Sequence, residues 1–204
     1  MVRKTDPVRY EEKRGEILEA AERCFARRGF HGATIAQICA EAKISPGHLY
    51  HYFETKESII EAIVGAGLEY VTARAAQIPE DANPITAVIA EIEHFNADYK
   101  KSGPGILLDM LAEAGRDPAI GKLLQDSSAS MRVLMAGLLR KGQASGQIDP
   151  HLDTDTAAAV LLSIIDSSKA LSIRVPRLDA KKRAKVVSQM ITRFLSPPGR
   201  TPGA

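Results

Sequence analysis

Apolar side chains recur every three or four positions along most of the chain, which is the period of an amphipathic helix. Clusters of Gly, Pro, Ser and Asp interrupt this repeat at intervals. No stretch alternates strictly between apolar and polar residues, as a half-buried strand would. The pattern therefore predicts an all-α protein of about nine helices. They are expected at about residues 8–28, 34–42, 56–77, 84–100, 104–115, 118–144, 154–173 and 180–195, with a very short helix from residue 46.

Residues 34–53 combine two short helices with a tight turn. Thr34 is expected to cap the first helix, because a hydroxyl at this place accepts from a free backbone N–H. Ser45 is expected to cap the second, with Pro46 at the first helical position, where its missing N–H costs nothing. This arrangement predicts a helix-turn-helix. Its anchors to a core would be the apolar residues Ile35, Ile38, Leu49 and Phe53.

The second helix of this unit would enter the major groove of DNA, with small or polar residues at its N-terminal end. Pro46 and Gly47 are small enough for the backbone to approach base edges closely. His48 and His51 can donate or accept hydrogen bonds there, although histidine reads bases less specifically than a bidentate Arg or Asn. The expected groove face is Ser45, Pro46, Gly47, His48 and His51.

Phosphate contacts would fix the register of this helix on DNA. Tyr50 has an aromatic body to pack and a hydroxyl to donate. Thr34 and Lys56 lie at helix N-termini, where backbone N–H groups favour an anion. Lys56 is expected to add a mobile charge. We therefore predict Thr34, Tyr50 and Lys56 as phosphate contacts.

Composition changes this picture little. The chain has 204 residues, 45% of them hydrophobic, which is enough for a sizeable core, and its formal net charge of +2 gives no strong hint of a nucleic-acid partner. Cys24 and Cys39 lack metal-ligand spacing and are expected to be buried, although a redox role stays open. No window approaches a membrane span and no apolar signal-peptide core begins the chain, so we expect a cytoplasmic protein without a cofactor.

An enzyme is the main alternative class. The sequence contains no HExxH, no GxSxG, no GxxxxGK[ST] and no GxGxxG between a strand and a helix. Pairs of carboxylates occur, but their helical spacing is typical of a charged surface. These patterns favour a regulator over an enzyme.

The N-terminal stretch resembles the DNA-binding domain of the TetR family of transcriptional regulators. The resemblance covers about residues 10–65. One position departs from the pattern, since the family commonly has Gly in the turn where this chain has Lys43. A positive φ at Lys43 would be mildly unfavourable and would place a cation near the backbone. The matching residues are Ile17, Ala20, Ala21, Cys24, Phe25, Gly29, Phe30, Thr34, Ile35, Ile38, Ala42, Ile44, Ser45, Gly47, Leu49, Tyr50, His51, Tyr52, Phe53, Lys56 and Glu57.

The resemblance implies a homodimer with DNA-binding heads and larger ligand-binding bodies. Residues 1–55 would form the DNA-binding domain, residues 56–195 the ligand-binding and dimerisation domain, and residues 196–204 a disordered tail. Residues 80–204 match the family only in the number and layout of helices. The implied partners are a double-stranded DNA operator, a small-molecule effector and a second copy of the chain.

Two helices near the end of the chain suit a dimer interface. The stretch 156–173 is apolar on nearly every face, so it must be covered on several sides. Paired across a two-fold axis with the last helix, it would make a four-helix bundle. The alternative is that both helices only complete a monomer core. The expected interface residues are Ala158, Leu161, Leu162, Val187, Met190, Ile191 and Phe194.

The ligand site is expected among the helices of the body, where Met and aromatic residues line adaptable pockets. For each candidate, ordinary core packing is the competing explanation. Asp166 stands out because it lies in an apolar helix, where a buried carboxylate needs a partner. The candidates are Phe95, Tyr99, Leu107, Met110, Leu111, Met131, Leu134, Met135, Ile165 and Asp166.

These elements predict a ligand-responsive regulator, most simply a repressor released from a palindromic operator by a small, largely apolar effector. A ligand that shifts the fourth helix would change the separation of the two recognition helices in the dimer. Two alternatives stay open, which are a helical interaction module that never meets DNA and an activator without small-molecule induction.

Overall fold

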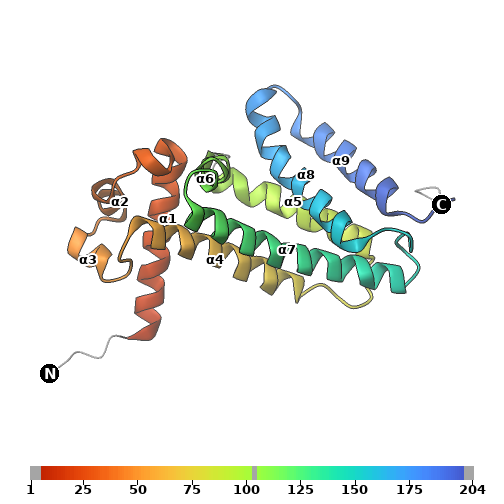
Figure 1. Cartoon of the computed structure of the whole chain (residues 1–204), viewed down its shortest axis with the longest axis horizontal. Coiled ribbons are helices and arrows are strands. Elements are labelled where there is room, and N and C mark those ends of the chain that lie inside the picture. The colour runs from red at the N-terminus through yellow and green to blue at the C-terminus, as the bar shows by residue number, and fades with distance from the viewer. Residues whose placement is uncertain (1–5, 103–104, 200–204) are drawn as a thin grey trace. The chain divides into compact units, whose positions relative to one another are not determined.

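The computed structural model describes residues 6–102 and 105–199. Within these residues it contains nine helices and no strand, which confirms the all-α prediction (Figure 1). Each helix begins and ends close to the position that the sequence predicts. The helices are α1 (Pro7–Gly32), α2 (Ile35–Ala42), α3 (Pro46–Tyr50), α4 (Lys56–Ala75), α5 (Pro84–Ser102), α6 (Gly105–Ala114), α7 (Pro118–Ala144), α8 (Thr154–Arg174) and α9 (Ala180–Leu195).

The predicted caps form at α2 and α3. The Thr34 hydroxyl accepts from the Gln37 N–H at 3.3 Å, and the Gln37 side chain accepts from the Thr34 N–H at 3.1 Å. This reciprocal pair is a capping box, which satisfies two backbone donors at the start of α2. At α3 the Ser45 hydroxyl accepts from the His48 N–H at 3.2 Å, and Pro46 occupies the first helical position. Short local signals therefore set both helix starts.

Two residues with positive φ shape the turns around α2. Gly29 has φ 70° and ψ 169°, so the regular part of α1 stops there, as predicted, before a last short turn to Gly32. Lys43 has φ 54° and ψ 44° and closes α2 in the left-handed conformation. The positive φ proposed for Lys43 is confirmed. A side chain with a Cβ in this conformation costs about 1–2 kcal/mol, which the surrounding helices must offset.

The chain divides into two compact units. The first consists of Met1–Gly67 and Ser102–Gln125. In it α1 contacts α2 and α6, and α2 contacts α3. Ile59 and Ile60 of α4 are at most 2% exposed, so the early turns of α4 belong to this unit. The N-terminal segment of this unit runs to Gly67, and the unit also takes in α6.

The second unit consists of Leu68–Lys101 and Asp126–Ala204. Its core draws on α5, α7, α8, α9 and the loop before α8. No helix in the described part of the chain is long and apolar enough to cross a membrane. Of the tail predicted at residues 196–204, positions 200–204 lie outside the described residues. The buried core residues are Val88, Ile92, Met135, Ala136, Leu139, Ile148, Ala157, Ala158, Leu161, Ile165, Ile191 and Leu195.

Candidate nucleic-acid interface and ligand cavity

The short helix α3 is anchored by apolar residues and leaves its polar face exposed. Leu49 is 0% exposed and Phe53 3%, so both hold α3 to the first unit. Ile38 of α2 is also fully buried, whereas Ile35, the fourth predicted anchor, is half-buried. The predicted groove face, together with Tyr50, is exposed as DNA contact requires: Ser45, Pro46, Gly47, His48, Tyr50 and His51.

Aromatic rings connect the start of α1 to the end of α3. The Tyr10 and Tyr52 rings stack with centroids 4.6 Å apart, and the Tyr10 and His51 rings meet edge-on at 6.0 Å. His48 lies 5.5 Å from the Tyr52 ring. These contacts orient both histidines. Tyr10 was not among the residues predicted for this surface. Its signal was present, since Tyr10 precedes Ile17 by seven residues and thus extends the apolar stripe of α1.

A charged clamp joins α1 to α2. The Arg23 Nε donates to the Glu41 carboxylate at 2.9 Å, and the Arg27 guanidinium donates to its other oxygen. These two hydrogen bonds, first that of Arg23 and then that of Arg27, lower the pKa of Glu41 below its ordinary value. The clamp therefore keeps Glu41 ionised and fixes the helix that precedes the recognition turn.

Lys56 makes contacts that the sequence did not predict. Its ammonium donates to the carbonyl oxygens of Phe30 at 2.9 Å and Ala33 at 3.4 Å. It also lies 4.2 Å from the centroid of the Phe30 ring. The expectation that Lys56 carries a mobile charge is therefore wrong, because two carbonyl oxygens and the Phe30 ring hold this ammonium at the end of α1.

The other predicted phosphate contacts are differently placed. Thr34 and Lys43 are exposed, and Tyr50 is 51% exposed. The Thr34 hydroxyl accepts the Gln37 N–H and keeps its own hydrogen for another acceptor. Thr34, Lys43 and Tyr50 therefore have donors that a phosphate can reach.

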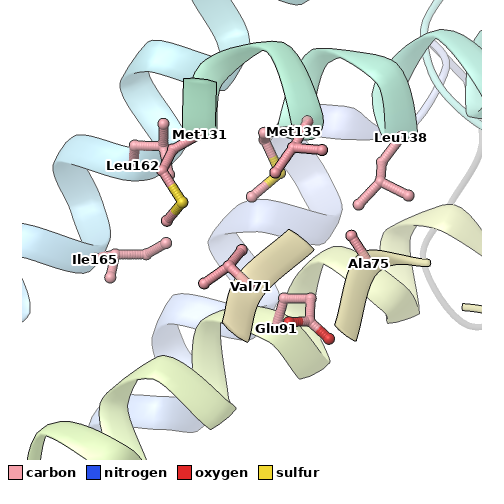
Figure 2. A pocket seen from close by; sticks show the side chains of 9 residues that line it. Val71, Ala75, Glu91, Met131, Met135, Leu138, Leu162 and Ile165 are labelled. Atoms are coloured by element: carbon pink, nitrogen blue, oxygen red, sulfur yellow. The ribbon is translucent and has the colours of Figure 1, made fainter. Parts of the chain in front are cut away.

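The second unit contains a cavity of about 30 Å³, room for about two water molecules. The predicted ligand contacts Met131, Leu134, Met135 and Ile165 line it. In Figure 2, Glu91 of α5 lies on the opposite side of the cavity from Met131 and Met135 of α7. Because ligand sites usually measure about 300–1,000 Å³, this cavity must open to admit an effector. The lining residues absent from the prediction are Val71, Ala75, Glu91, Leu138 and Leu162.

The remaining ligand candidates do not line this cavity. Leu107, Met110 and Leu111 belong to the first unit, where Met110 is buried and Leu111 is 48% exposed. Asp166 is half-buried and is not among the lining residues. The side chains of Phe95 and Tyr99 lie outside the described residues.

Glu91 is the lining residue with the most unusual surroundings. Its side chain is 13% exposed and accepts two hydrogen bonds from Arg74, Nη2 at 2.9 Å and Nε at 3.2 Å. This pairing raises the pKa of Arg74 above its ordinary value. The sequence carried a signal for Glu91, which lies between the buried Val88 and Ile92 on the inner face of α5.

Next to this pair, the Tyr70 hydroxyl and His94 Nε2 are 2.6 Å apart. The Arg74 guanidinium lies 6.0 Å from the centroid of the Tyr70 ring. Polar contacts therefore join α4 to α5 at two neighbouring places, Tyr70 with His94 and Arg74 with Glu91.

The predicted interface residues fall into three groups by exposure. Ala158, Leu161 and Ile191 are at most 1% exposed and belong to the core of the second unit, so they are unavailable to a partner. Leu162 and Val187 are half-buried against the same core. Only Met190, 46% exposed, and Phe194, 40% exposed, present large apolar surface. Further exposed apolar residues on α8, on α9 and between them are Val160, Ile173, Val175, Leu178 and Val186.

Comparison with known proteins identifies the class to which this architecture belongs. Residues 17–63 match the family of bacterial regulatory proteins described as the tetR family. Residues 105–196 match the C-terminal domain of BetI-type transcriptional repressors. The chain belongs to the TetR family, whose members are DNA-binding transcriptional regulators rather than enzymes.

Individual relatives agree with this assignment. The chain is 30% identical over 152 residues to the HTH-type transcriptional regulator UidR of Escherichia coli K12. The aligned region covers 74% of this chain and 76% of UidR. The chain is 30% identical over 151 residues to the HTH-type transcriptional repressor KstR2 of Mycobacterium tuberculosis, covering 70% and 72% of the two chains. The structure of Salmonella enterica GusR superposes with a TM-score of 0.77 at 26% identity and covers 95% of this chain and 98% of GusR.

Proposed function

We propose that this chain is a dimeric repressor that binds a palindromic operator and is released by a small, largely apolar effector. The observation that carries the proposal is the surface of α3 and of the residues after it, where Leu49 and Phe53 are buried and every predicted groove residue is exposed. The relative KstR2 is named a repressor, which favours repression over activation.

In this proposal His48 and His51 reach base edges, while Pro46 and Gly47 allow close approach of the backbone. Thr34, Lys43 and Tyr50 contact phosphates and fix the register. Lys56 does not contact DNA in this proposal. Its hydrogen bonds to the end of α1 stabilise the structure that positions α2 and α3.

Dimerisation uses the exposed apolar residues of α8 and α9, with a second copy of the chain as the occupant. A palindromic operator presents two half-sites about 34 Å apart, so two recognition helices must be held at that spacing. An isologous interface built from Met190, Phe194 and Val160 would supply the two-fold axis.

Release follows if an effector enters the cavity of the second unit. The chain passes from the cavity residues Val71 and Ala75 into the first unit within the single helix α4. An effector that prefers the non-binding conformation by about 1–3 kcal/mol is enough to change operator occupancy substantially.

The experiment is a band-shift assay of the full chain with the DNA upstream of its own gene, at several salt concentrations. A variant with His48→Ala and His51→Ala should lose specific binding. The matched control is His151→Ala, because His151 is exposed in the loop before α8. Retained binding in the double variant would refute the groove assignment, and no binding by the wild type would favour a helical interaction module. Increased transcription from a bound promoter would favour an activator.

A further inference from the structure

Helix α3 is too short to fix the direction of its own polar side chains. It has five residues, Pro46–Tyr50, and His51 lies just beyond its last turn. An isolated helix of this length is not stable in water, so packing against other parts of the chain determines its orientation. Leu49 and Phe53 anchor the buried side of this segment, whereas His48 and His51 lie on its exposed side.

Tyr10 of α1 connects both imidazoles to the rest of the first unit. Its ring stacks on Tyr52 at a centroid distance of 4.6 Å and an interplanar angle of 28°. The Tyr52 ring is also contacted by His48 at 5.5 Å and by His51 at 5.3 Å. His51 in addition meets the Tyr10 ring edge-on at 6.0 Å. Both tyrosines are half-buried and both histidines are exposed, so the stacked rings support the imidazoles from the protein side.

The tyrosine rings restrict the imidazoles without occupying their nitrogen atoms. In the part of the chain that the structure describes, neither the His48 nor the His51 imidazole forms a hydrogen bond or an ion pair. The ring nitrogens therefore keep their capacity to donate to base edges or to accept from them. Contacts between aromatic rings prefer defined geometries, so they limit the rotamers that each imidazole adopts.

We propose that Tyr10 is a positioning residue for sequence recognition, which holds the Tyr52 ring and thereby directs both imidazoles toward the bases. The inference rests on the proposed function, because it requires that α3 enters the major groove. Arg14, one helical turn after Tyr10, lies 5.4 Å from the centroid of the Phe53 ring, so the same face of α1 contacts this segment at a second point. Side chains that are oriented before binding lose less conformational entropy in the complex, and this gain applies to base contacts rather than to phosphate contacts.

The test compares Tyr10→Leu, which keeps an apolar side chain but removes the ring, with Tyr10→Phe, which keeps the ring. The preferred DNA site of the full-length wild type is first selected from a random library. Affinities for that site and for a scrambled duplex are then measured at one salt concentration. For Tyr10→Leu the ratio of the two affinities should fall about tenfold, the order of one well-placed base contact. Its affinity for the scrambled duplex should stay within about twofold of the wild type, because phosphate contacts are unchanged.

Two comparisons separate the ring from other effects. Tyr10→Phe should keep the wild-type ratio of affinities, because the stacked ring remains. Tyr70→Leu is the matched control and should also keep it, because Tyr70 is an exposed tyrosine of the second unit.

Proton NMR of the free protein separates positioning from a general loss of stability. The imidazole signals of His48 and His51 carry ring-current shifts from the tyrosine rings. Tyr10→Leu should therefore move these signals, whereas Tyr70→Leu should not. Circular dichroism checks that each variant folds. If Tyr10→Leu does not fold, Tyr52→Leu breaks the same stack from the other side and is judged by the same criteria.

Each contrary outcome has its own meaning. The inference is overturned if Tyr10→Leu keeps the wild-type ratio, if it loses affinity equally for both duplexes, or if the imidazole signals do not move. Lost discrimination in Tyr10→Phe would assign the effect to the hydroxyl, and the same loss in Tyr70→Leu would assign it to the chain as a whole, so either result overturns it too. A wild type that selects no DNA site refutes the proposed function and this inference with it, whereas the other outcomes leave the proposed function standing.

Discussion

The Lys56 ammonium donates a hydrogen bond to the Phe30 carbonyl oxygen at 2.9 Å, across 26 positions of the chain. The same ammonium lies over the Phe30 ring. Carbonyl groups at a helix C-terminus carry partial negative charge, so a cation there is favourable. The first residue of α4 is thereby fixed to the end of α1, next to the turn that begins α2.

Replacing Lys56 with Met should lower the free energy of unfolding by about 1–3 kcal/mol, because hydrogen bonds from a charged group are lost. Urea unfolding measures this, with Lys181→Met as the control on an exposed part of α9. Operator affinity should fall, but its dependence on salt should keep the same slope. A slope reduced by about one would instead show that Lys56 contacts a phosphate.

Lys43 combines a left-handed backbone with an exposed cation. Lys43→Gly and Lys43→Ala both remove the charge, but only glycine removes the Cβ that strains this conformation. The glycine variant should be more stable than the alanine variant by about 0.5–1 kcal/mol. Glycine relieves the backbone strain, but part of this gain is offset because an unfolded chain with glycine has more conformational freedom to lose on folding. Both variants should lose about one unit of salt slope in operator binding if Lys43 contacts a phosphate. Equal stability of the two would argue against strain at this turn.

Gly29 has φ 70°, and a Cβ built on it would lie 3.2 Å from the Asp109 carboxylate of α6. Gly29→Ala should therefore destabilise the protein by about 1–3 kcal/mol, because strain and crowding act together. The control is Gly65→Ala, since Gly65 lies within α4 with open space around it. Gly65→Ala should leave stability unchanged or raise it slightly. Thermal unfolding of both variants compares the two positions directly, and an equal response would contradict the close approach of α6.

Glu41 gives the first unit a pH-dependent contribution to stability. Its folded pKa is lowered by Arg23 and Arg27, so the contribution is fully present above the ordinary glutamate value and is lost as pH falls through the lower folded value. Glu41→Gln should be less stable than the wild type near pH 7, and the difference should shrink as the pH falls below about 4. Unfolding at three pH values checks this. The control is Glu19→Gln, because Glu19 also pairs with Arg23 but is more exposed. A difference that grows on acidification would have the wrong sign.

Much of the fold follows from short-range signals. Thr34, Ser45 and Pro46 determine where α2 and α3 begin, and each acts within three or four residues of itself. The contacts of Lys56 and Arg74 were not predictable in the same way. Their partners lie 26 and 17 positions away, and only the packing of helices decides which acceptor each cation reaches.

The same distinction holds for the candidate sites. The groove face lies on one short helix, so helical spacing is enough to predict it. The cavity draws lining residues from four helices, and the sequence indicated only the Met and Leu stripe of α7 and Ile165 of α8. Burial of Ala158 and Leu161 likewise depends on how α8 packs, because a helix that is apolar on all sides does not reveal which side faces a partner.

The exposed residues of α9 provide a test of the dimer. Phe194→Glu places a charge on a face that is 40% exposed in the single chain. It should convert a dimer into a monomer while leaving the fold intact, because a buried charge in an interface is costly and an exposed one is not. Sedimentation equilibrium measures the mass, and circular dichroism checks the fold. Val133→Glu is the matched control, since Val133 of α7 is 59% exposed and lies outside the proposed interface.

Operator binding should follow the state of assembly. A monomer contacts one half-site, so its affinity for the full palindrome should fall by at least about a hundredfold, the gain expected when a second site is held at high effective concentration. Affinity for an isolated half-site should not change, because α3 is untouched by the substitution. A Phe194→Glu protein that stays dimeric would place the interface elsewhere. A monomer that keeps full affinity for the palindrome would show that the two half-sites are not bound by one dimer.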